Sequence, residues 1–161
     1  MKSSFRIVGL TRAQFEPLFS LNEQELAAKG ARRVTVDAKP GFPCRIGLAD
    51  AEIGETMILT NFLHHDVKTP YRASGPIYVR EKAGDRHLKA GEIPEVVSSR
   101  TISVRAYDQD GLMLEGNVVP GTAIEPHLDR LFANQKVAYA HLHNAGAGCY
   151  SCKVERAKPS A

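Results

Sequence analysis

Hydrophobic and polar residues alternate with a period of two along several short stretches of the chain, which is typical of half-buried β-strands. These stretches are residues 4–10, 32–38, 76–81 and 101–108, with a shorter strand expected around 44–47. Residues 55–63 (ETMILTNFL) are apolar on both faces, which predicts a central strand that is covered on both sides. A long polar loop is expected to follow at 64–76.

Other stretches carry apolar residues at helical spacing. Residues 11–30 predict two short helices, the second with Asn22 as its N-cap and Glu25 at the capping-box position. A short helical segment is expected at 95–100. A longer helix is predicted over 122–134, where Ile124, Leu128, Leu131 and Phe132 share one face.

Two hairpins complete the pattern, one over 101–119 and one over 137–155. Strands outnumber helices, several connections are short, and no repeated alternation of strand and helix is present. The pattern therefore favours the α+β class, with a mainly antiparallel sheet and helices packed on one face. The length fits a single domain over residues 1–156, followed by a flexible tail at 157–161.

Composition and charge exclude several classes of protein. The net charge of +3 is mildly basic and the cations are scattered, so no nucleic-acid partner is expected. No apolar run is long enough to cross a membrane, and the N-terminus lacks the pattern of a signal peptide. The 3 cysteines are an odd number, which favours reduced thiols in the cytoplasm. The oligomeric state does not follow from the sequence.

The last hairpin (VAYAHLHNAGAGCYSCKVE, residues 137–155) concentrates the reactive chemistry of the chain. Side chains two apart on a strand share a face, so Tyr139, His141 and His143 lie together. Ala138, Ala140 and Leu142 occupy the other face, which belongs against the core. The face with the histidines meets solvent or lines a pocket.

The leading hypothesis for this hairpin is a thiol site. If the hairpin closes evenly around Gly146, His143 lies opposite Cys149, at a distance that suits a thiolate–imidazolium pair. Cys149 would then be the nucleophile and His143, or His141, its base. A slip of one residue in the register would place Cys149 on the opposite face.

A small anionic molecule would suit such a site. Asn144 and the amides of Gly146 and Gly148 would donate hydrogen bonds to an oxyanion. Arg72 and Ser74, in the loop at 64–76, would anchor the anion, unless Arg72 instead pairs with a nearby acid and pins its loop.

A divalent metal is the alternative chemistry for the same hairpin, and no other cofactor is predicted. His141 and His143 have a spacing that places two imidazoles on one ion, together with a more distant ligand. A closed site that adds Cys149 and Cys152 is disfavoured, because residues three apart on a strand face opposite ways. His64 and His65 are adjacent on an extended segment, so both cannot readily face one site. Whether the protein is an enzyme or a binding module that does no catalysis stays open, as does an ordinary hairpin with inert buried thiols.

Five segments of the chain carry a resemblance to a known family: FRIVGL, ARRVTVDAKPGFPCRIGLADAEIGE, PYRASGPIYVRE, SVRAYDQDGLM and AYAHLHNAGAGCY. Together they resemble a bacterial family catalogued as domain of unknown function 1203, from near the N-terminus to about residue 156. The resemblance implies a small, soluble, single-domain protein and transfers no catalytic role. It marks as family features Pro43–Arg45, Tyr71–Arg72, Ser74–Pro76, His141, His143, Asn144 and Cys149.

Overall fold

In the computed structural model, which describes residues 3–158, eight strands pair into two antiparallel sheets. The strands are β1 (Phe5–Val8), β2 (Arg32–Thr35), β3 (Thr56–His65), β4 (Ala73–Arg80), β5 (Thr101–Tyr107), β6 (Met113–Pro120), β7 (Tyr139–Asn144) and β8 (Tyr150–Arg156). The helices are α1 (Glu16–Phe19), α2 (Glu23–Ala28), α3 (Glu95–Ser98) and α4 (Ile124–Phe132), with 3-10 turns at Arg12–Gln14 and Gly121–Ala123. The α+β class and the antiparallel pairing predicted from the sequence are confirmed.

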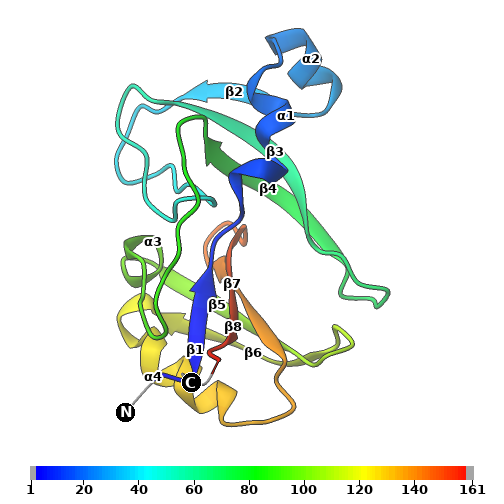
Figure 1. The fold of residues 1–161 in the computed structure, drawn as a ribbon, viewed down its shortest axis with the longest axis vertical. Coiled ribbons are helices and arrows are strands. Elements are labelled where there is room, and N and C mark those ends of the chain that lie inside the picture. The colour runs from blue at the N-terminus through cyan, green and yellow to red at the C-terminus, as the bar shows by residue number, and fades with distance from the viewer. Residues whose placement is uncertain (1–2, 159–161) are drawn as a thin grey trace.

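The larger sheet has the strand order β1-β8-β7-β5-β6 and lies in the lower half of the molecule (Figure 1). One of its faces packs on α3 and α4. Ala140 and Leu142 of β7 belong to this core, together with Leu128 and Phe132 of α4. The small apolar face of β7 therefore meets a helix, as its alternation predicted, and the face with the histidines points the other way.

The smaller sheet has the order β2-β3-β4 and has a core of its own (Figure 1). β3 is its central strand, as its apolar sequence predicted. The helix α2 begins with the predicted capping box, in which the Asn22 side chain accepts from the Glu25 amide and the Glu25 side chain accepts from the Asn22 amide. The strands thus divide into two sheets with two cores, a division that the pattern of strands did not reveal.

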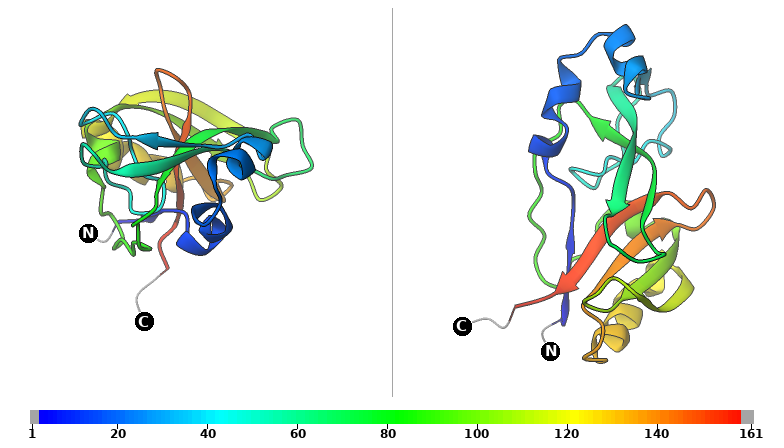
Figure 2. Two further views of the ribbon diagram at one scale, coloured as in Figure 1. Left: turned by 90° about the horizontal axis from the view of Figure 1, so that it is seen from above. Right: turned by 90° about the vertical axis from the view of Figure 1, so that its right-hand side faces the viewer.

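The two sheets meet at the middle of the molecule, where β8 lies beside the end of the smaller sheet (Figure 2). The segment at 42–51 contributes to this junction. Expected to contain a short strand, it forms only isolated bridges, between Pro43 and Asp50 and between Cys44 and Tyr78. This difference follows from its proline and glycine residues, which interrupt a strand ladder.

The ends of the chain add one contact. The Ala157 amide donates to the Ser4 carbonyl at 2.9 Å, which continues the pairing of β1 with β8. Of the tail expected at 157–161, residues 159–161 lie outside the described residues. Within residues 3–158, none of the helices has the length and the apolar character needed to cross a bilayer.

Candidate functional site

Three histidines from two different sheets converge at the junction. His64 comes from the end of β3, and His141 and His143 come from β7. One ring nitrogen of each histidine lies within 4.8 Å of a ring nitrogen of each of the other two. His64 therefore occupies the position of the more distant third ligand that the metal alternative requires.

A β-bulge explains how His64 reaches this position. The pairing of β3 with β4 shifts register between Leu63 and His65, so that the bulge re-aims the side chains of the last residues of β3. The His64 ring lies 6.0 Å from the His141 ring, and the His65 ring lies 5.1 Å from it. The expectation that these two adjacent histidines cannot face one site is therefore wrong, because it assumed a regular strand.

His143 is held in one tautomer by the turn of the hairpin. Its Nδ1 lies 2.9 Å from the carbonyl oxygen of Gly148. A carbonyl oxygen only accepts hydrogen bonds, so Nδ1 must carry the proton. Nε2 of neutral His143 consequently has a free lone pair, and this atom is buried without a hydrogen-bond partner among the described residues.

The neighbouring His65 differs in that both of its nitrogens are used. Nδ1 donates to the Tyr71 carbonyl at 2.8 Å, and Nε2 lies 2.6 Å from the Tyr139 hydroxyl. Since Nδ1 holds the proton, the Tyr139 hydroxyl donates to Nε2. His65 is thus a supporting residue that packs against His141, with no lone pair left to offer a ligand.

Burial keeps the converging histidines neutral. Desolvation lowers the pKa of His141 to about 2 and the pKa of His143 to about 4. The pKa of His64 is also lowered to about 4, first by desolvation and then by the charge of Arg105. At neutral pH each of these rings therefore carries a lone pair on one nitrogen.

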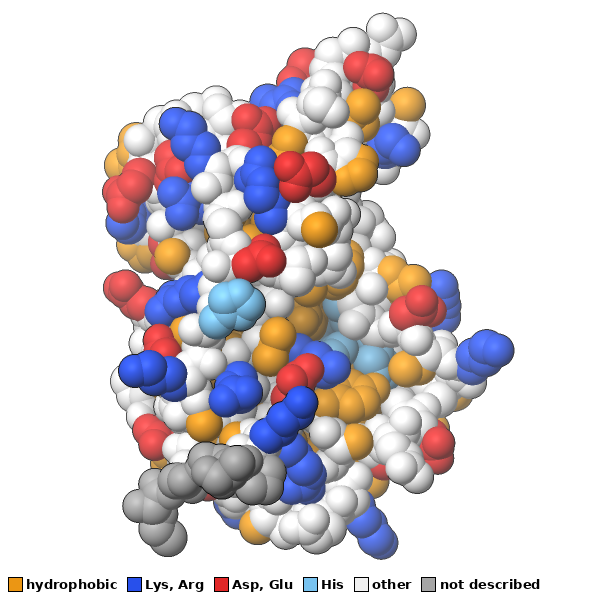
Figure 3. Space-filling view, in the orientation of Figure 1, with side chains coloured by type: hydrophobic (Ala, Val, Ile, Leu, Met, Phe, Trp, Pro, Cys, Tyr) orange, Lys and Arg blue, Asp and Glu red, His pale blue; other side chains and the backbone are white. Residues whose placement is uncertain are grey.

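Aromatic rings enclose the cluster on one side and leave it partly open on another. The Tyr150 ring stacks on His64 with centroids 5.2 Å apart and meets the His141 ring edge-on at 5.1 Å. His141 and His143 are buried, whereas His64 is only half-buried. Figure 3 shows histidine side chains in a hollow between the two halves of the molecule. The partial exposure of His64 gives the cluster a route to solvent.

The register of the last hairpin separates Cys149 from the histidines. β7 pairs with β8 so that His143 lies opposite Tyr150, with a register shift next to it. The Asn144 amide donates to the Cys149 carbonyl at 2.9 Å, which places Cys149 opposite Asn144. The even register on which the pairing of Cys149 with His143 depended is therefore not formed, and the hairpin is offset by one residue.

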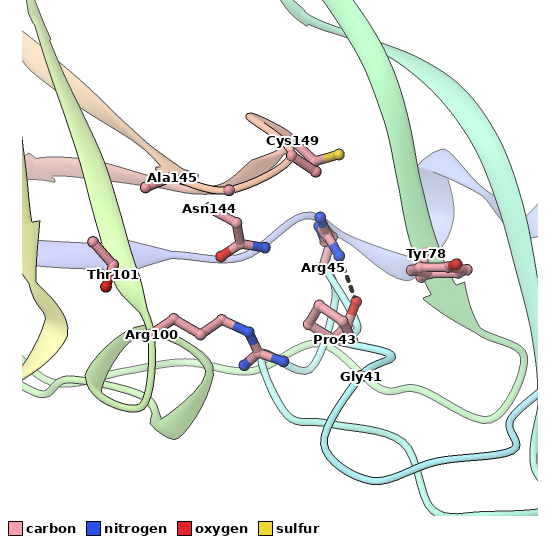
Figure 4. A pocket seen from close by; sticks show the side chains of 11 residues that line it. Gly41, Pro43, Arg45, Tyr78, Arg100, Thr101, Asn144, Ala145 and Cys149 are labelled. Carbon is pink, nitrogen blue, oxygen red and sulfur yellow. Dashed lines mark hydrogen bonds between the residues drawn. The ribbon is translucent and has the colours of Figure 1, made fainter.

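Cys149 instead lines a cavity of about 520 Å³ on the other face of the hairpin (Figure 4). Its walls come from both sheets and from the 42–51 segment. They are formed by Gly41, Pro43, Arg45, Tyr78, Arg100, Thr101, Asn144, Ala145, Gly146, Ala147 and Cys149. Of the predicted ligand-binding residues, Asn144 and Gly146 therefore share this cavity with Cys149, while the Gly148 amide is taken by the Asn144 carbonyl at 2.8 Å.

The predicted anion anchor lies elsewhere. Because β3 runs to His65 and β4 begins at Ala73, the loop expected at 64–76 is shorter than predicted. Arg72 lies in this turn and Ser74 lies in β4; both are exposed, and neither belongs to the cavity wall. Arg72 forms an ion pair with Asp66 of the same loop at 3.7 Å. This contact matches the simpler alternative, in which Arg72 pins its loop.

The three cysteines are free and have different surroundings. Cys44 and Cys152 are buried, and burial raises the pKa of Cys152 to about 12. Cys152 packs in the core of the larger sheet, so a site that joins it to the histidines is not formed. Cys149 is only partly buried and is the accessible thiol of the set.

A family model described as "Protein of unknown function (DUF1203)" matches residues 41–156, well over half of the chain. The chain belongs to the DUF1203 family. No curated protein and no solved structure matches it.

The part of this DUF1203 protein that matches the family contains both features of the junction. The histidine cluster and the cavity lie wholly within residues 41–156, whereas β1, β2 and the helices α1 and α2 precede it. The family description names no activity, so the function has to be inferred from the chemistry of these two features.

Sequence reasoning missed two residues of this DUF1203 protein that the structure brings to the junction. His64 was set aside because regular strand geometry separates it from His65. Arg45 was marked only as part of the family segment Pro43–Arg45 and was given no role. An arginine between Cys44 and Ile46 was the available signal in the sequence, since a charged residue in an apolar, proline-containing segment needs a partner.

Proposed function

We propose that this DUF1203 protein binds one transition-metal ion of the zinc class through His64, His141 and His143. The observation that carries the proposal is the convergence of three ligand atoms within 4.8 Å from two separate sheets. Each of these histidines also has a ring nitrogen that is buried and unpartnered among the described residues, namely Nδ1 of His64, Nδ1 of His141 and Nε2 of His143. Buried polar atoms are nearly always hydrogen-bonded, so three orphans in one place call for a ligand.

The donor set indicates which ions would suit the site. Neutral imidazole is a ligand for zinc, copper, iron and nickel, and it is a poor one for calcium or magnesium. Three protein ligands leave at least one coordination position for water or another small ligand, which is the arrangement of open zinc sites. An ion held in this way could activate a bound water or polarise a carbonyl group.

The supports around the histidines favour the same conclusion. The hydrogen bond from His143 Nδ1 to the Gly148 carbonyl, 2.9 Å long, fixes the ring so that Nε2 offers its lone pair to an ion. Such second hydrogen bonds are usual for histidines that bind metals, and they orient the ring and set its tautomer. His65 braces His141 from the side, with both of its own nitrogens occupied.

Metal binding would require a modest closure of the cluster. Bonds of about 2.0–2.1 Å to a tetrahedral ion place the ligand nitrogens about 3.3 Å apart. His64 is the half-buried member and follows a bulge, so it is the ring with room to move. We therefore expect His64 to close onto an ion that His141 and His143 already face.

The thiol chemistry is not included in this proposal. Cys149 lies opposite Asn144 and on the far face of the hairpin from His143, so no base is in position for it. A binding module without a metal is the remaining alternative. It would leave the three orphaned nitrogens to be satisfied by water.

The test is the metal content of protein purified without an affinity tag and without chelator. We expect elemental analysis to find about one zinc, iron, nickel or copper per chain. Metal-free protein should take up one equivalent of Co²⁺ and develop the visible absorption of a tetrahedral nitrogen site. The variant His64→Asn should lose at least tenfold in its affinity for Co²⁺, because it removes one of the three imidazole ligands.

The matched control is His87→Asn, which removes an exposed histidine outside the cluster. This variant should bind Co²⁺ as the unmodified protein does. Protein that carries no metal, takes up no Co²⁺ and keeps its full stability would overturn the proposal. Equal losses in the two variants would show that the histidine cluster is not the site.

A further inference from the structure

We infer that the cavity beside Cys149 binds the carboxylate group of a small molecule, with Arg45 as the residue that recognises it. This site lies on the opposite face of the hairpin from the histidines and does not depend on a metal. Figure 4 shows the Arg45 guanidinium beside Asn144 and near Cys149, at the wall of the cavity.

Arg45 is only 3% exposed, yet its charge has no partner of opposite sign within residues 3–158. Its Nε donates to the Tyr150 carbonyl at 2.7 Å and its Nη1 donates to the Pro43 carbonyl at 2.7 Å. Nη2 makes no hydrogen bond to the described residues, and no carboxylate in this part of the chain pairs with the guanidinium. An arginine stays charged under all physiological conditions, so burial without a counter-charge is unfavourable unless a ligand supplies one.

Asp50, which bridges to Pro43 beside Arg45, is already engaged. Asp50 forms a two-point ion pair with Arg100, with distances of 2.7 Å and 3.2 Å between oxygen and nitrogen. Arg100 also lines the cavity, and none of the residues that line it is acidic. Asp50 neutralises Arg100, so the charge of Arg45 is left over at this wall. A ligand with one negative charge would balance it.

Backbone contacts hold Arg45 firmly in this place. Its amide donates to the Tyr78 carbonyl at 3.1 Å, and its carbonyl accepts from the Leu10 amide at 2.9 Å. The Arg45 side chain reaches β8 through the Tyr150 carbonyl. A donor fixed in advance by both sheets loses little freedom when it binds a ligand, which favours affinity.

Polar atoms beside Arg45 fit a carboxylate. The Asn144 side chain lies next to the guanidinium in Figure 4, with its amide nitrogen on the side of Arg45, so that its NH2 group can donate to a carboxylate. Thr101 adds a hydroxyl to the same wall. The single free nitrogen of the Arg45 fork matches one carboxylate better than a doubly charged phosphate, which takes more donors.

The rest of the cavity fits an apolar body. Pro43, Ala145, Ala147 and the Tyr78 ring line it, and its volume of about 520 Å³ is that of a typical site for a small molecule. The inferred ligand is therefore a small molecule with one carboxylate and an apolar or aromatic remainder.

Cys149 provides a direct test, because its accessible thiol lies at the same wall. Its sulfur displaces iodide from iodoacetate, which carries a carboxylate, and from iodoacetamide, which is neutral and of similar size. For Cys149 we compare the rate with iodoacetate divided by the rate with iodoacetamide. We expect this rate ratio to be about tenfold or more higher in the folded protein than in the urea-unfolded chain, because a charge-assisted hydrogen bond holds the anionic reagent. Peptide mass spectrometry measures the rates, with buried Cys44 and Cys152 as internal references. An unchanged ratio would overturn the inference.

Competition identifies the group that is bound. Benzoate should protect Cys149 from iodoacetamide, whereas benzamide, its neutral analogue, should not. Protection by inorganic phosphate at lower concentration than benzoate would replace a carboxylate site with a phosphate site and overturn the inference as stated.

Two variants connect the effect to Arg45 and keep it separate from the metal proposal. Arg45→Lys keeps the charge and loses the planar fork, so the preference for iodoacetate should fall several-fold. If this variant does not fold, the benzoate and benzamide comparison on the unmodified protein decides alone. His64→Asn should keep the full preference, so a failure of metal binding leaves this result intact.

Discussion

The two faces of the β7–β8 hairpin solve the same electrostatic problem in opposite ways. On one face, burial has removed the charge from His64, His141 and His143, whose pKa values are lowered to about 4, about 2 and about 4. On the other face, Arg45 is as buried as His141 and His143 and cannot give up its charge at neutral pH. The first face is left with lone pairs that suit a cation, and the second with a charge that suits an anion.

The difference teaches that hairpin register, rather than residue composition, decides which chemistry is assembled. An even register would have paired Cys149 with His143 in one thiol site. The observed offset of one residue places Cys149 with Asn144 and Arg45, and places His143 with Tyr150 and His64. The same hairpin thereby presents neutral imidazole rings on one face and borders a buried guanidinium on the other.

The largest expected effect that separates the faces is acid destabilisation of the metal-free protein, carried by the histidines. The pKa of buried His143 is about 4 in the folded state against an ordinary value of 6.5, so the unfolded chain binds more protons between these values. The contribution of His143 to stability should therefore be constant above pH 6.5 and should fall as the pH drops below 6.5. It should stop falling near pH 4, where folded His143 also takes up its proton. The loss should be on the order of 3 kcal/mol for His143 alone. Urea unfolding of chelator-treated protein across this pH range measures it.

His143→Asn should make this pH dependence shallower, since asparagine does not titrate, while His64 and His141 continue to contribute. His87→Asn serves as the control because His87 is exposed, and it should leave the slope unchanged. A slope that is the same in all three proteins would mean that the histidine face does not carry a buried neutral cluster.

Local chemistry made most of the elements predictable. The Asn22–Glu25 capping box and the apolar stripe of residues 124–132 each depend on neighbours within one or two turns, and both are formed as predicted. The division into two sheets was not predictable, because it depends on which strands pair across long stretches of chain. The pairing of β1 with β8, for example, joins the first and last strands.

The candidate site was predicted in part for the same reason. The shared face of His141 and His143 follows from the period of a strand. His64 joins them only because a bulge interrupts β3, and Cys149 leaves them because β7 and β8 shift register next to His143. Bulges depend on tertiary packing as much as on local sequence, so an ideal strand period gave the wrong partners.

A smaller effect should come from supplying the anion on the cavity face. Cys149→Asp places a carboxylate at the wall beside Arg45, whereas Cys149→Asn places a neutral side chain of the same shape there. The aspartate variant should be more stable than the asparagine variant by about 1 kcal/mol, because the ion pair is only partly shielded from water. Urea unfolding at neutral pH compares the two. If the asparagine variant proves as stable or more stable, the charge of Arg45 is already compensated and the contrast between the faces fails.

The smallest effect concerns Arg105, a cation whose charge acts on two of the three histidines. Arg105 lies opposite His141 in the pairing of β5 with β7, and its charge contributes to the lowered pKa values of His64 and His143. The same repulsion should weaken metal binding, so Arg105→Gln should tighten Co²⁺ affinity by less than tenfold, or about 1 kcal/mol at most. Raising the salt concentration should shrink the difference, because Arg105 is only half-buried.

The control for this last effect is Lys29→Gln, which removes the same formal charge from an exposed position after α2. Competition with a chromophoric chelator measures the affinity of each variant. An equal gain in both variants would assign the effect to net charge and not to Arg105. Weaker binding in Arg105→Gln would instead make Arg105 a residue that positions the histidines, since the loss of its packing against β7 would then outweigh the loss of its charge.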